Sequence, residues 1–264
     1  MLFLKLGGSL ITDKTRDNTP RMEVLQRLAH EIRTFLDDRH PEPLLIGHGS
    51  GSFGHAAAKK YGTRTGVHSA DDWRGFAEVS VVAARLNRIV ADALFDAGVP
   101  VVSVLPSAST GCADGRIVRF DLRLIETALA HHLTPLVMGD VALDSIRGGT
   151  IVSTEEVFAY LADHMPVSRI LLAGETAGVY RSMDQPDILP VITPTTWQEV
   201  QHGIGASRGA DVTGGMAGKV RDMLALASAH PGMPIRIFSG LIEGSLTRAL
   251  NNESIGTLLH SDEK

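Results

Sequence analysis

Three glycine-rich segments contain the residue types of a phosphate-binding site. The first is Lys5-Leu6-Gly7-Gly8-Ser9, which follows directly on an apolar run. Two glycines at this place let the backbone approach a phosphate closely, and Lys5 supplies a positive charge. Ligands of open α/β sheets bind beyond the carboxyl ends of the strands, so the position suits a ligand site. A tight turn that needs glycine only for its dihedral freedom is the alternative.

The second segment is His48-Gly49-Ser50-Gly51-Ser52-Phe53-Gly54-His55, and four glycines lie within residues 47–54. A strand, a glycine-rich loop and a helix in succession bring free amides and the positive end of a helix dipole to one point. The segment lacks the Gly-Lys-Ser/Thr of a Walker A loop, and no ribose-binding acid follows at the distance typical of the dinucleotide motif. We interpret His55 as a hydrogen-bond donor to a phosphate oxygen and His48 as structural.

The third segment is Asp211-Val212-Thr213-Gly214-Gly215-Met216-Ala217-Gly218-Lys219. Asp211 or Thr213 can cap the helix that follows, and the two adjacent glycines expose its first amides. Lys219 lies about one turn along, near enough to reach phosphates bound at that end. A capped surface helix with an exposed lysine is the alternative. Lys14 is a further candidate cation near the first segment, although a lysine in a polar loop is commonly solvated.

Strands and helices in alternation must position these segments. Nearly continuous apolar runs predict strands that are covered on both faces, and apolar residues spaced three or four apart predict amphipathic helices. This alternation indicates a mostly parallel α/β sheet with helices on both sides, in one compact unit. The segment Tyr180–Thr196 is rich in Pro, Asp and Thr and predicts a surface loop or short hairpin. The expected strands are Leu2–Leu6, Leu44–Gly47, Val99–Leu105, Leu136–Met138, Ile170–Leu172 and Ile235–Phe238, and the expected helices are Met22–Leu36, Asp71–Ala97, Leu122–His131, Thr154–His164 and Gly214–Ala229.

Composition limits the classes of function. The chain has 264 residues, of which 44% are hydrophobic and 21% charged, with a formal net charge of -5. Because this charge offers no basic surface, we expect no nucleic-acid partner. The single cysteine, Cys112, excludes an intrachain disulfide and fits a reducing compartment. The apolar start MLFLKLGGSLI is too short to cross a bilayer and lacks a basic leader, so we expect a cytoplasmic protein without a membrane partner.

In this order and at these spacings, the three segments resemble the amino acid kinase superfamily, and within it most of all the isopentenyl phosphate kinase family. Gly139-Asp140-Val141 and Gly178-Val179-Tyr180 match the same pattern. The resemblance implies an α/β fold, an open three-layer αβα sandwich around a mostly parallel sheet. It implies a single domain with an acceptor-binding lobe at about residues 1–165 and an ATP-binding lobe at about residues 166–264. It also implies ATP and Mg²⁺ as cofactors, isopentenyl phosphate as acceptor, isopentenyl diphosphate as product, and a possible homodimer.

The resemblance further assigns roles to individual residues. Lys5, Lys14 and His55 are the expected catalytic residues, and His55 is the one that marks members with a phosphate acceptor. No metal ligand is expected from the protein, since ATP oxygens and water can hold the magnesium. The expected ATP-binding residues are Lys5, Leu6, Gly7, Gly8, Ser9, Gly51, Gly174, Glu175, Gly178, Tyr180, Gly215 and Lys219, and the expected substrate-binding residues are Gly49, Ser50, Gly54, His55, Gly139, Asp140, Gly148 and Gly149.

Two positions depart from the family pattern. The chain has Gly49-Ser50-Gly51 where three successive glycines are usual, and serine keeps the amide donor. It has Gly174-Glu175-Thr176-Ala177-Gly178-Val179-Tyr180 where T-D-V-D-G-V-Y is common, so one acidic residue is replaced by Ala177 and Glu175 can stand in for another. The second departure affects the nucleotide contacts more than the reaction.

Other functions stay open at this point. A kinase of another small phosphate or phosphonate, such as a fosfomycin-type kinase, would use the same loops and differ in the pocket beyond the phosphate. A prenyl acceptor needs an apolar pocket there, and the helix Asp71–Ala97 could line it with some of Phe76, Val79, Val82, Ala83 and Leu86, most of which we expect in the core. His55 counts against a carboxylate or nucleotide kinase. A non-catalytic nucleotide-binding sensor would have less need for all of the lysines.

Overall fold

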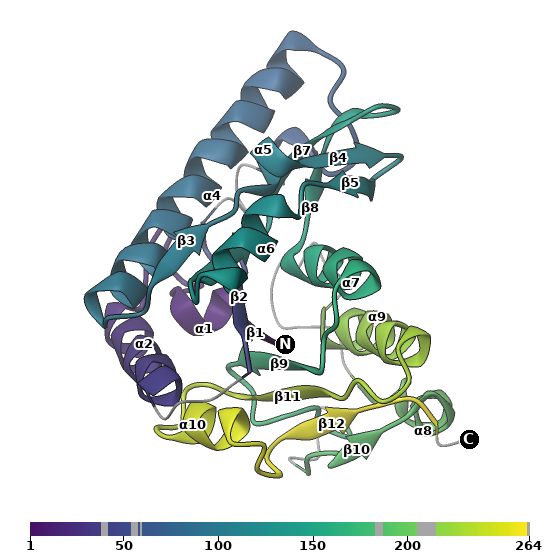
Figure 1. Cartoon of the computed structure of the whole chain (residues 1–264). Helices are drawn as coiled ribbons and strands as arrows, with labels where there is room; N and C mark the ends of the chain where they lie inside the picture. The colour runs from purple at the N-terminus through teal and green to yellow at the C-terminus, as the bar shows by residue number, and fades with distance from the viewer. Residues whose placement is uncertain (38–41, 54–57, 59, 183–186, 205–214, 263–264) are drawn as a thin grey trace.

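The computed structural model describes residues 1–37, 42–53, 58, 60–182, 187–204 and 215–262. Within these residues, an eight-stranded sheet with the order β10-β12-β11-β9-β1-β2-β6-β3 forms the centre of the molecule (Figure 1). Every neighbouring pair in it is parallel except β11 with β12. The strands are β1 Leu2–Leu6, β2 Leu44–His48, β3 Val101–Ser103, β6 Thr134–Met138, β9 Arg169–Gly174, β10 Val191–Ile192, β11 Ile235–Ser239 and β12 Thr257–Leu259.

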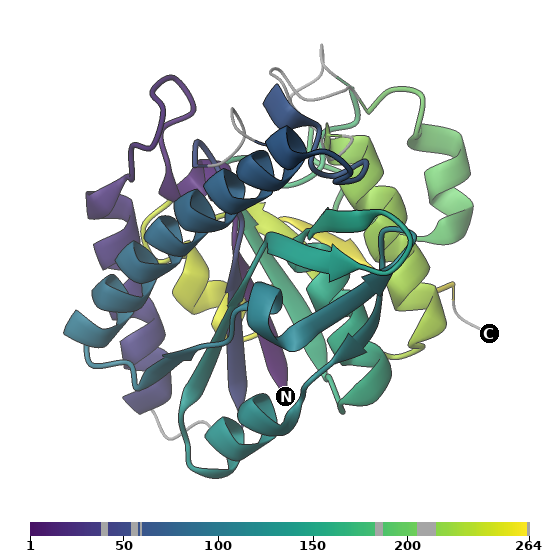
Figure 2. The same ribbon diagram turned by 90° about the horizontal axis from the view of Figure 1, so that it is seen from above.

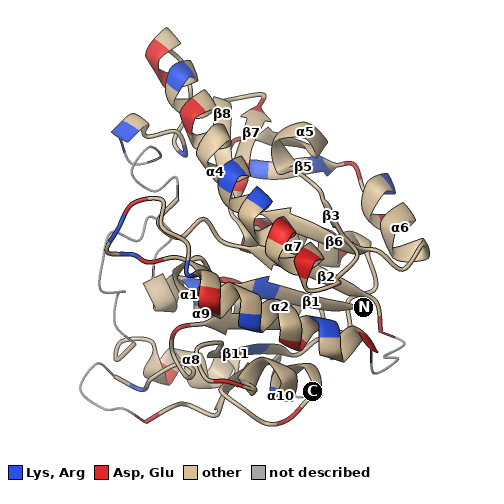
Figure 3. Ribbon diagram, turned by 90° about the vertical axis from the view of Figure 1, so that its left-hand side faces the viewer, with Lys and Arg blue, Asp and Glu red and all other residues tan. Residues whose placement is uncertain are grey.

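Helices cover both faces of this sheet. Helices α2 (Met22–Asp37), α4 (Ala70–Asp96) and α10 (Ser245–Leu250) pack on one face, and α7 (Thr154–His164) and α9 (Gly215–Ala229) pack on the other (Figures 1 and 2). Acidic and basic residues are interspersed along α2 and α4 (Figure 3). The remaining helices are α1 Gly8–Ile11, α5 Pro106–Ser109, α6 Arg123–Ala130 and α8 Pro194–Val200. The arrangement is a three-layer αβα sandwich, which confirms the predicted fold class.

The alternation of side chains along each strand decides which layer a functional residue meets. In β1, Leu2, Leu4 and Leu6 belong to the core under α2 and α4, whereas Phe3 belongs to the core under α7. Because successive side chains of a strand point to opposite faces, Lys5 lies on the α7 side with Phe3. By the same rule His48, two residues after Ile46 in β2, lies on the α4 side.

A second sheet of four strands, in the order β5-β4-β7-β8, packs beside α4. Its strands are β4 Thr110–Ala113, β5 Arg116–Phe120, β7 Asp140–Asp144 and β8 Gly148–Val152. Asp144 accepts hydrogen bonds from four backbone amides in the β4–β5 and β7–β8 turns, those of Asp114, Gly115, Ile146 and Arg147, at 2.6–3.1 Å. One buried carboxylate therefore joins the two turns of this sheet.

The long elements were predicted well, and the short ones were not. Strand β1 and helix α7 match their predicted bounds, and the other long helices match within one residue at each end. The expected strand at Val99–Leu105 shortens to Val101–Ser103 because Pro106 starts α5 shortly after it. The four-stranded sheet, α5, α8, α10 and β10 were not predicted. Among the described residues, no helix combines the length and the apolar character that crossing a bilayer requires.

Candidate active site

The carboxyl ends of five parallel strands are joined side by side by backbone hydrogen bonds. Gly139 donates to the carbonyl of His48, which connects the end of β6 to the end of β2. Four such bonds form a continuous series: Gly139 N to His48 O at 3.3 Å, Gly49 N to Leu6 O at 3.1 Å, Gly7 N to Ala173 O at 2.8 Å, and Gly240 N to Gly174 O at 2.8 Å. The first and second glycine-rich segments and the expected nucleotide segment therefore begin at one edge of the sheet.

The loops after β1 and β2 touch through their backbones. A Cβ atom on Gly8 would lie 2.6 Å from the Cα of Gly51, and one on Gly49 would lie 2.9 Å from the nitrogen of Gly8. Gly51 also has a φ of +53°, in the left-handed region that favours glycine. Side chains at these positions would push the loops apart, so the glycines bring two sets of amides into one place.

Thr12 connects the two loops, a role that the sequence analysis did not predict. It is fully buried, its hydroxyl donates to the carbonyl of Gly8 at 2.7 Å, and the same oxygen accepts from the amide of Ser52 at 2.8 Å. A hydroxyl is both a donor and an acceptor, so one threonine satisfies a group in each loop.

The ammonium group of Lys5 forms an ion pair with the carboxylate of Glu155 in the first turn of α7. The two side chains are 10% and 19% exposed, so water screens the pair only weakly. Burial by itself raises the pKa of Glu155, but the positive charges of Lys5 and Lys219 outweigh this and lower that pKa to about 2. Glu155 is therefore an anion at neutral pH, paired with Lys5 and subject to the positive charge of Lys219, which is 214 residues farther along the chain.

The start of α7 also supports the loop after β2. The hydroxyl of Thr154 donates to the carbonyl of His48 at 2.6 Å, and Ser153 and Glu156 form a capping box that fixes the first turn of the helix. A Cβ atom on Gly47 would lie 2.5 Å from the methyl group of Thr154, so this glycine allows the close approach of helix and strand. None of these α7 residues was among the predicted site residues, although the S-x-x-E pattern at the helix start was a readable signal.

Asp140 lies at the neighbouring strand end and is 2% exposed. Its carboxylate accepts hydrogen bonds from the amides of Ser107 at 3.1 Å and of Val141 at 2.8 Å. Burial raises the pKa of Asp140 despite these bonds. The carboxylate thus joins β7 to α5, next to Gly139, which is the one residue between β6 and β7.

The family model described as "Amino acid kinase family" matches residues 1–239. The chain belongs to the amino acid kinase family. It is 35% identical over 266 residues to the isopentenyl phosphate kinase of Methanothermobacter thermautotrophicus, covering 97% of each chain. It is 31% identical to the isopentenyl phosphate kinase of Methanocaldococcus jannaschii over the full length of both. A crystal structure of an isopentenyl phosphate kinase superposes with a TM-score of 0.80 at 32% identity, covering 98% of this chain and 99% of the other.

In this member of the amino acid kinase family, Lys14 lies on an exposed loop that follows α1. The loop is closed by the amide of Asp13 bonding to the carbonyl of Thr19 at 2.9 Å, and it contacts the second glycine loop where Asn18 donates to the carbonyl of Ser52 at 3.4 Å. Its end is joined to the segment after β9, because Arg21 forms an ion pair with Glu175 at 2.9 Å. Lys14 is thus on a loop that borders both the second glycine-rich segment and the segment after β9.

The expected nucleotide-binding residues in the segment that begins at the end of β9 differ in how tightly they are packed. A Cβ atom on Gly174 would have its nearest neighbour 4.0 Å away, so this glycine is not required by packing. Gly178 is packed, since a Cβ atom there would lie 2.5 Å from Ile188 and 2.7 Å from Thr257. Tyr180 is 36% exposed and faces Ile188 in a single antiparallel bridge, within the segment predicted as a surface loop or short hairpin.

Gly148 and Gly149 begin β8 on the side of the small sheet that faces α4. A Cβ atom on Gly149 would lie 2.9 Å from the ring of Phe76 and from a methyl group of Val67, and Gly148 has a φ of +74°. These glycines let β8 approach a small apolar cluster next to α4, which consists of Val79, Val141, Ala58, Phe76 and Ile151. Of the five side chains expected to border an apolar pocket, Val79, Ala83 and Leu86 are buried, and Phe76 and Val82 are partly exposed.

Some predicted residues lie outside the described part of the chain. They are His55 and Gly54 in the second segment and Asp211, Thr213 and Gly214 in the third. Gly215 and Lys219 are described at the start of α9, with Gly215 buried and Lys219 half-buried.

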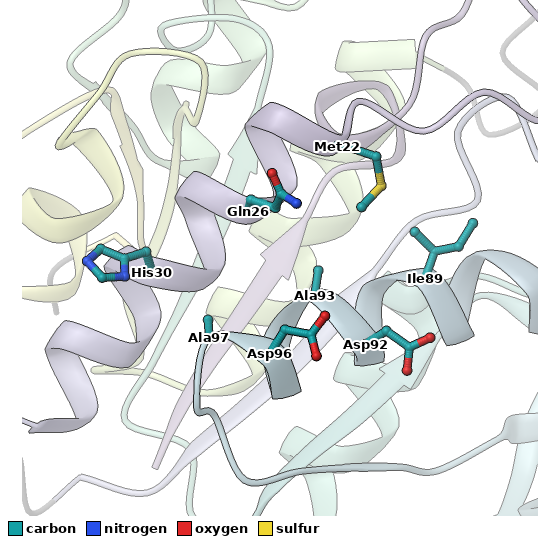
Figure 4. A pocket seen from close by; sticks show the side chains of 8 residues that line it. All are labelled: Met22, Gln26, His30, Ile89, Asp92, Ala93, Asp96 and Ala97. Carbon is teal, nitrogen blue, oxygen red and sulfur yellow. The ribbon is translucent and has the colours of Figure 1, made fainter.

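A pocket of about 370 Å³ lies between α2 and α4 and contains none of the predicted site residues (Figure 4). Its floor is apolar, with Ile89 and Ala93 of α4, and its rim carries His30, Asp92 and Asp96. The residues that line the pocket include no lysine or arginine, in contrast to the end of the sheet where Lys5 and the glycine loops meet.

Proposed function

We propose that the protein is an isopentenyl phosphate kinase, which transfers the γ-phosphoryl group of ATP to isopentenyl phosphate and releases isopentenyl diphosphate and ADP. The observation that carries the proposal is the ion pair of Lys5 and Glu155 beside two glycine loops in direct contact, with the charge of Lys219 acting on the same carboxylate. The similarity to isopentenyl phosphate kinases over the whole chain supports the same activity.

The reaction needs alignment and charge neutralisation more than covalent help from the protein. An oxygen of the acceptor's phosphate attacks the γ-phosphorus, and the bond from that phosphorus to the β–γ bridging oxygen breaks. The acceptor oxygen is already a nucleophile at neutral pH, so the site needs no general base. A set of lysines and amides, without a Ser–His–Asp arrangement, suits this chemistry.

The proposal divides these groups between the two substrates. The amides of Ser50 and Gly51, with His55, hold the acceptor's phosphate. Lys5 and Lys14 stabilise charge on the transferring phosphoryl group. The donor phosphates contact three residues from the first and third segments, which are Gly8, Gly215 and Lys219.

Glu155 has a positioning role in this proposal. Its low pKa keeps it anionic, so it does not move protons during the reaction. As an anion paired with Lys5, it orients that ammonium group and offsets the repulsion between Lys5 and Lys219. The Lys5 ammonium group then stays in place before ATP binds, which reduces the reorganisation that the reaction requires.

The isoprenoid tail of the acceptor requires apolar surface next to its phosphate. The apolar cluster between α4 and the small sheet, around Phe76, Val79 and Val141, is our candidate for this surface. It extends from β7, which starts at Asp140 immediately after the end of β6. A tail leaving the phosphate loop toward α4 would meet these side chains.

Magnesium enters the proposal together with ATP. Among the described residues, no three His, Cys, Asp or Glu side chains gather in a way that could hold a metal ion. Glu155, the acidic side chain beside the lysines, is already paired. We therefore expect the oxygens of the nucleotide and of water to hold the magnesium ion. The ion would neutralise further negative charge on the phosphates.

The experiment that tests the function is ADP release with a panel of acceptors: isopentenyl phosphate, dimethylallyl phosphate, fosfomycin, UMP and glutamate. We expect isopentenyl phosphate to give the highest kcat/KM and glutamate to give none. Turnover confined to glutamate or UMP would refute the proposed acceptor. ATP binding without turnover for any acceptor would instead indicate a sensor.

Three accompanying expectations remain predictions: the division into an acceptor lobe and an ATP lobe near residue 165, a cytoplasmic location, and a homodimer. Light scattering of the purified protein at micromolar concentration measures the last of these directly.

A further inference from the structure

A small polar cluster lies within the apolar layer between the sheet and α4. It consists of His48 at the end of β2, Asn87 in the middle of α4 and Ser103 at the end of β3. His48 is 1% exposed and Asn87 is 5% exposed. The Nε2 atom of His48 lies 3.2 Å from Oδ1 of Asn87, and the Asn87 amide bonds to the hydroxyl of Ser103 at 2.8 Å. Burying polar groups among apolar neighbours is unfavourable unless they are satisfied, and the proposed reaction gives these three residues no part.

The other ring nitrogen of His48 contacts the glycine loop. Its Nδ1 atom lies 3.2 Å from the carbonyl oxygen of Gly49. A carbonyl can only accept, so this hydrogen bond places a proton on Nδ1. Burial lowers the pKa of His48, although its bonds to Gly49 and Asn87 oppose the shift, and a neutral ring has just this one N–H. Its Nε2 then accepts an N–H from Asn87 after a half-turn of that amide, which leaves the Asn87 oxygen to accept from Ser103.

This hydrogen bond fixes the orientation of a peptide group in the loop. No described peptide bond is cis, so the C=O of Gly49 and the N–H of Ser50 point in opposite directions from one planar group. When His48 holds the carbonyl on the α4 side, the Ser50 amide points away from that layer. Within the described part of the chain, the amide of Ser50 donates to no other protein group. It is therefore available to a ligand on the loop.

We propose that His48 is a positioning residue for the acceptor. Its imidazole orients the Gly49–Ser50 peptide so that the Ser50 amide faces the phosphate of a phosphate-monoester acceptor, and Asn87 and Ser103 hold the ring in that position. The inference rests on the proposed function, because that function assigns the acceptor's phosphate to this loop. It explains why a buried histidine directly precedes the loop.

Two substitutions separate the contacts of the two ring nitrogens. In His48→Asn, the side-chain amide takes the place of Nδ1, so a donor to Gly49 remains while the contact with Asn87 is lost. In His48→Gln, the amide reaches the place of Nε2, so the contact with Asn87 remains and Gly49 loses its donor. A third variant, Val90→Ala, removes buried volume from the same layer of α4 without touching the loop and serves as the matched control for lost packing.

The measurements are the KM for isopentenyl phosphate, the KM for ATP, and the rise in Tm caused by inorganic phosphate. We expect His48→Gln to raise the acceptor KM about tenfold or more, the size of a lost hydrogen bond to a charged group, with the KM for ATP unchanged. We expect His48→Asn to stay within about threefold of the parent protein, and Val90→Ala to lower Tm while both KM values hold.

Equal effects of His48→Asn and His48→Gln on the acceptor KM would overturn the inference, as would an unchanged KM in His48→Gln. The phosphate-induced rise in Tm distinguishes failure of the inference from failure of the proposed function. If the parent protein does not phosphorylate isopentenyl phosphate, His48→Gln must still lose this rise and His48→Asn must keep it. Any other pattern refutes the role of His48 in orienting the loop.

Discussion

The loops after β1 and β2 fit together through their backbones, whereas the residues at the end of β9, Gly174 and Glu175, have open space around the glycine and a partly exposed ion pair. On the first side, Gly8 and Gly51 are in contact, and Thr12 joins the loops from a fully buried position. On the second side, Gly174 has free space around it and Glu175 pairs with Arg21, each about one-third exposed.

This difference indicates how the two sides are expected to bind their substrates. Backbone contacts leave few alternative conformations, so the acceptor side is arranged before the substrate arrives. Exposed ion pairs contribute little to stability and rearrange easily, so the nucleotide side can adapt. We therefore predict that the same substitution, glycine to alanine, lowers the free energy of unfolding much more on the first side than on the second.

Gly51→Ala and Gly174→Ala test the comparison with the largest expected difference. At position 51 a methyl group would collide with Thr12 and Gly8 at a positive φ, so we expect a loss of about 2–5 kcal/mol in the free energy of unfolding. At position 174 the methyl group has room, and we expect a change below about 1 kcal/mol. Urea denaturation of the two variants gives both values, and similar losses would remove the distinction between the two sides.

Lys5→Met tests the charge where the two sides meet. Methionine keeps the apolar stem of the lysine and removes its ammonium group, so we expect kcat to fall by roughly 10²–10³. Lys60→Met is the matched control, since that lysine is exposed and its ammonium lies over the ring of Tyr61. Steady-state ADP release should be unchanged in the control. A Lys5→Met variant with nearly full kcat would show that this ammonium does not act on the transferring group.

Glu155→Gln removes the negative charge that pairs with Lys5, with little change in the size of the side chain. The pKa of Glu155 is lowered from 4.5 to about 2, so its stabilising contribution is complete above about pH 4.5 and is lost as the pH falls toward 2. We therefore expect the parent protein to be about 1–3 kcal/mol more stable than Glu155→Gln at pH 7. The difference should shrink in urea titrations between pH 4.5 and 3, and a constant difference would contradict the assigned pairing.

Arg21→Ala is expected to have the smallest effect. The ion pair with Glu175 is partly exposed, so its loss should cost less than about 1 kcal/mol of stability and change the KM for ATP only a few-fold. Exchanging the charges in the double variant Arg21→Glu, Glu175→Arg should bring the KM for ATP back toward the value of the parent protein. If the exchange makes ATP binding worse than Arg21→Ala alone, Arg21 contacts the nucleotide itself.

The sequence predicted the parts of the site that depend on local pattern. Apolar runs and amphipathic spacing identified β1, β2, α4 and α7, and glycines at strand ends identified the two loops that meet. The four-stranded sheet was missed because its strands are short, partly exposed and rich in turn residues, as at Asp114-Gly115, so their apolar runs are broken.

The partners of the lysines could not be predicted in the same way. Glu155 lies at a helix start that reads as an ordinary capping box, S-T-E-E, and its role depends on α7 packing over the face of β1 that carries Lys5. Likewise, Thr12 looks like a loop residue until Ser52 comes to lie beside it. These contacts join residues far apart in the chain, and a single sequence does not show which such residues will meet.

The most direct test of the central claim is a crystal structure of the protein with isopentenyl phosphate and a non-hydrolysable ATP analogue bound together. We predict that the acceptor's phosphate lies against the amides of Ser50 and Gly51, and that its nearest oxygen is about 3–3.5 Å from the γ-phosphorus, with Lys5 beside both. An acceptor bound elsewhere, or a γ-phosphate remote from Lys5, would contradict the account.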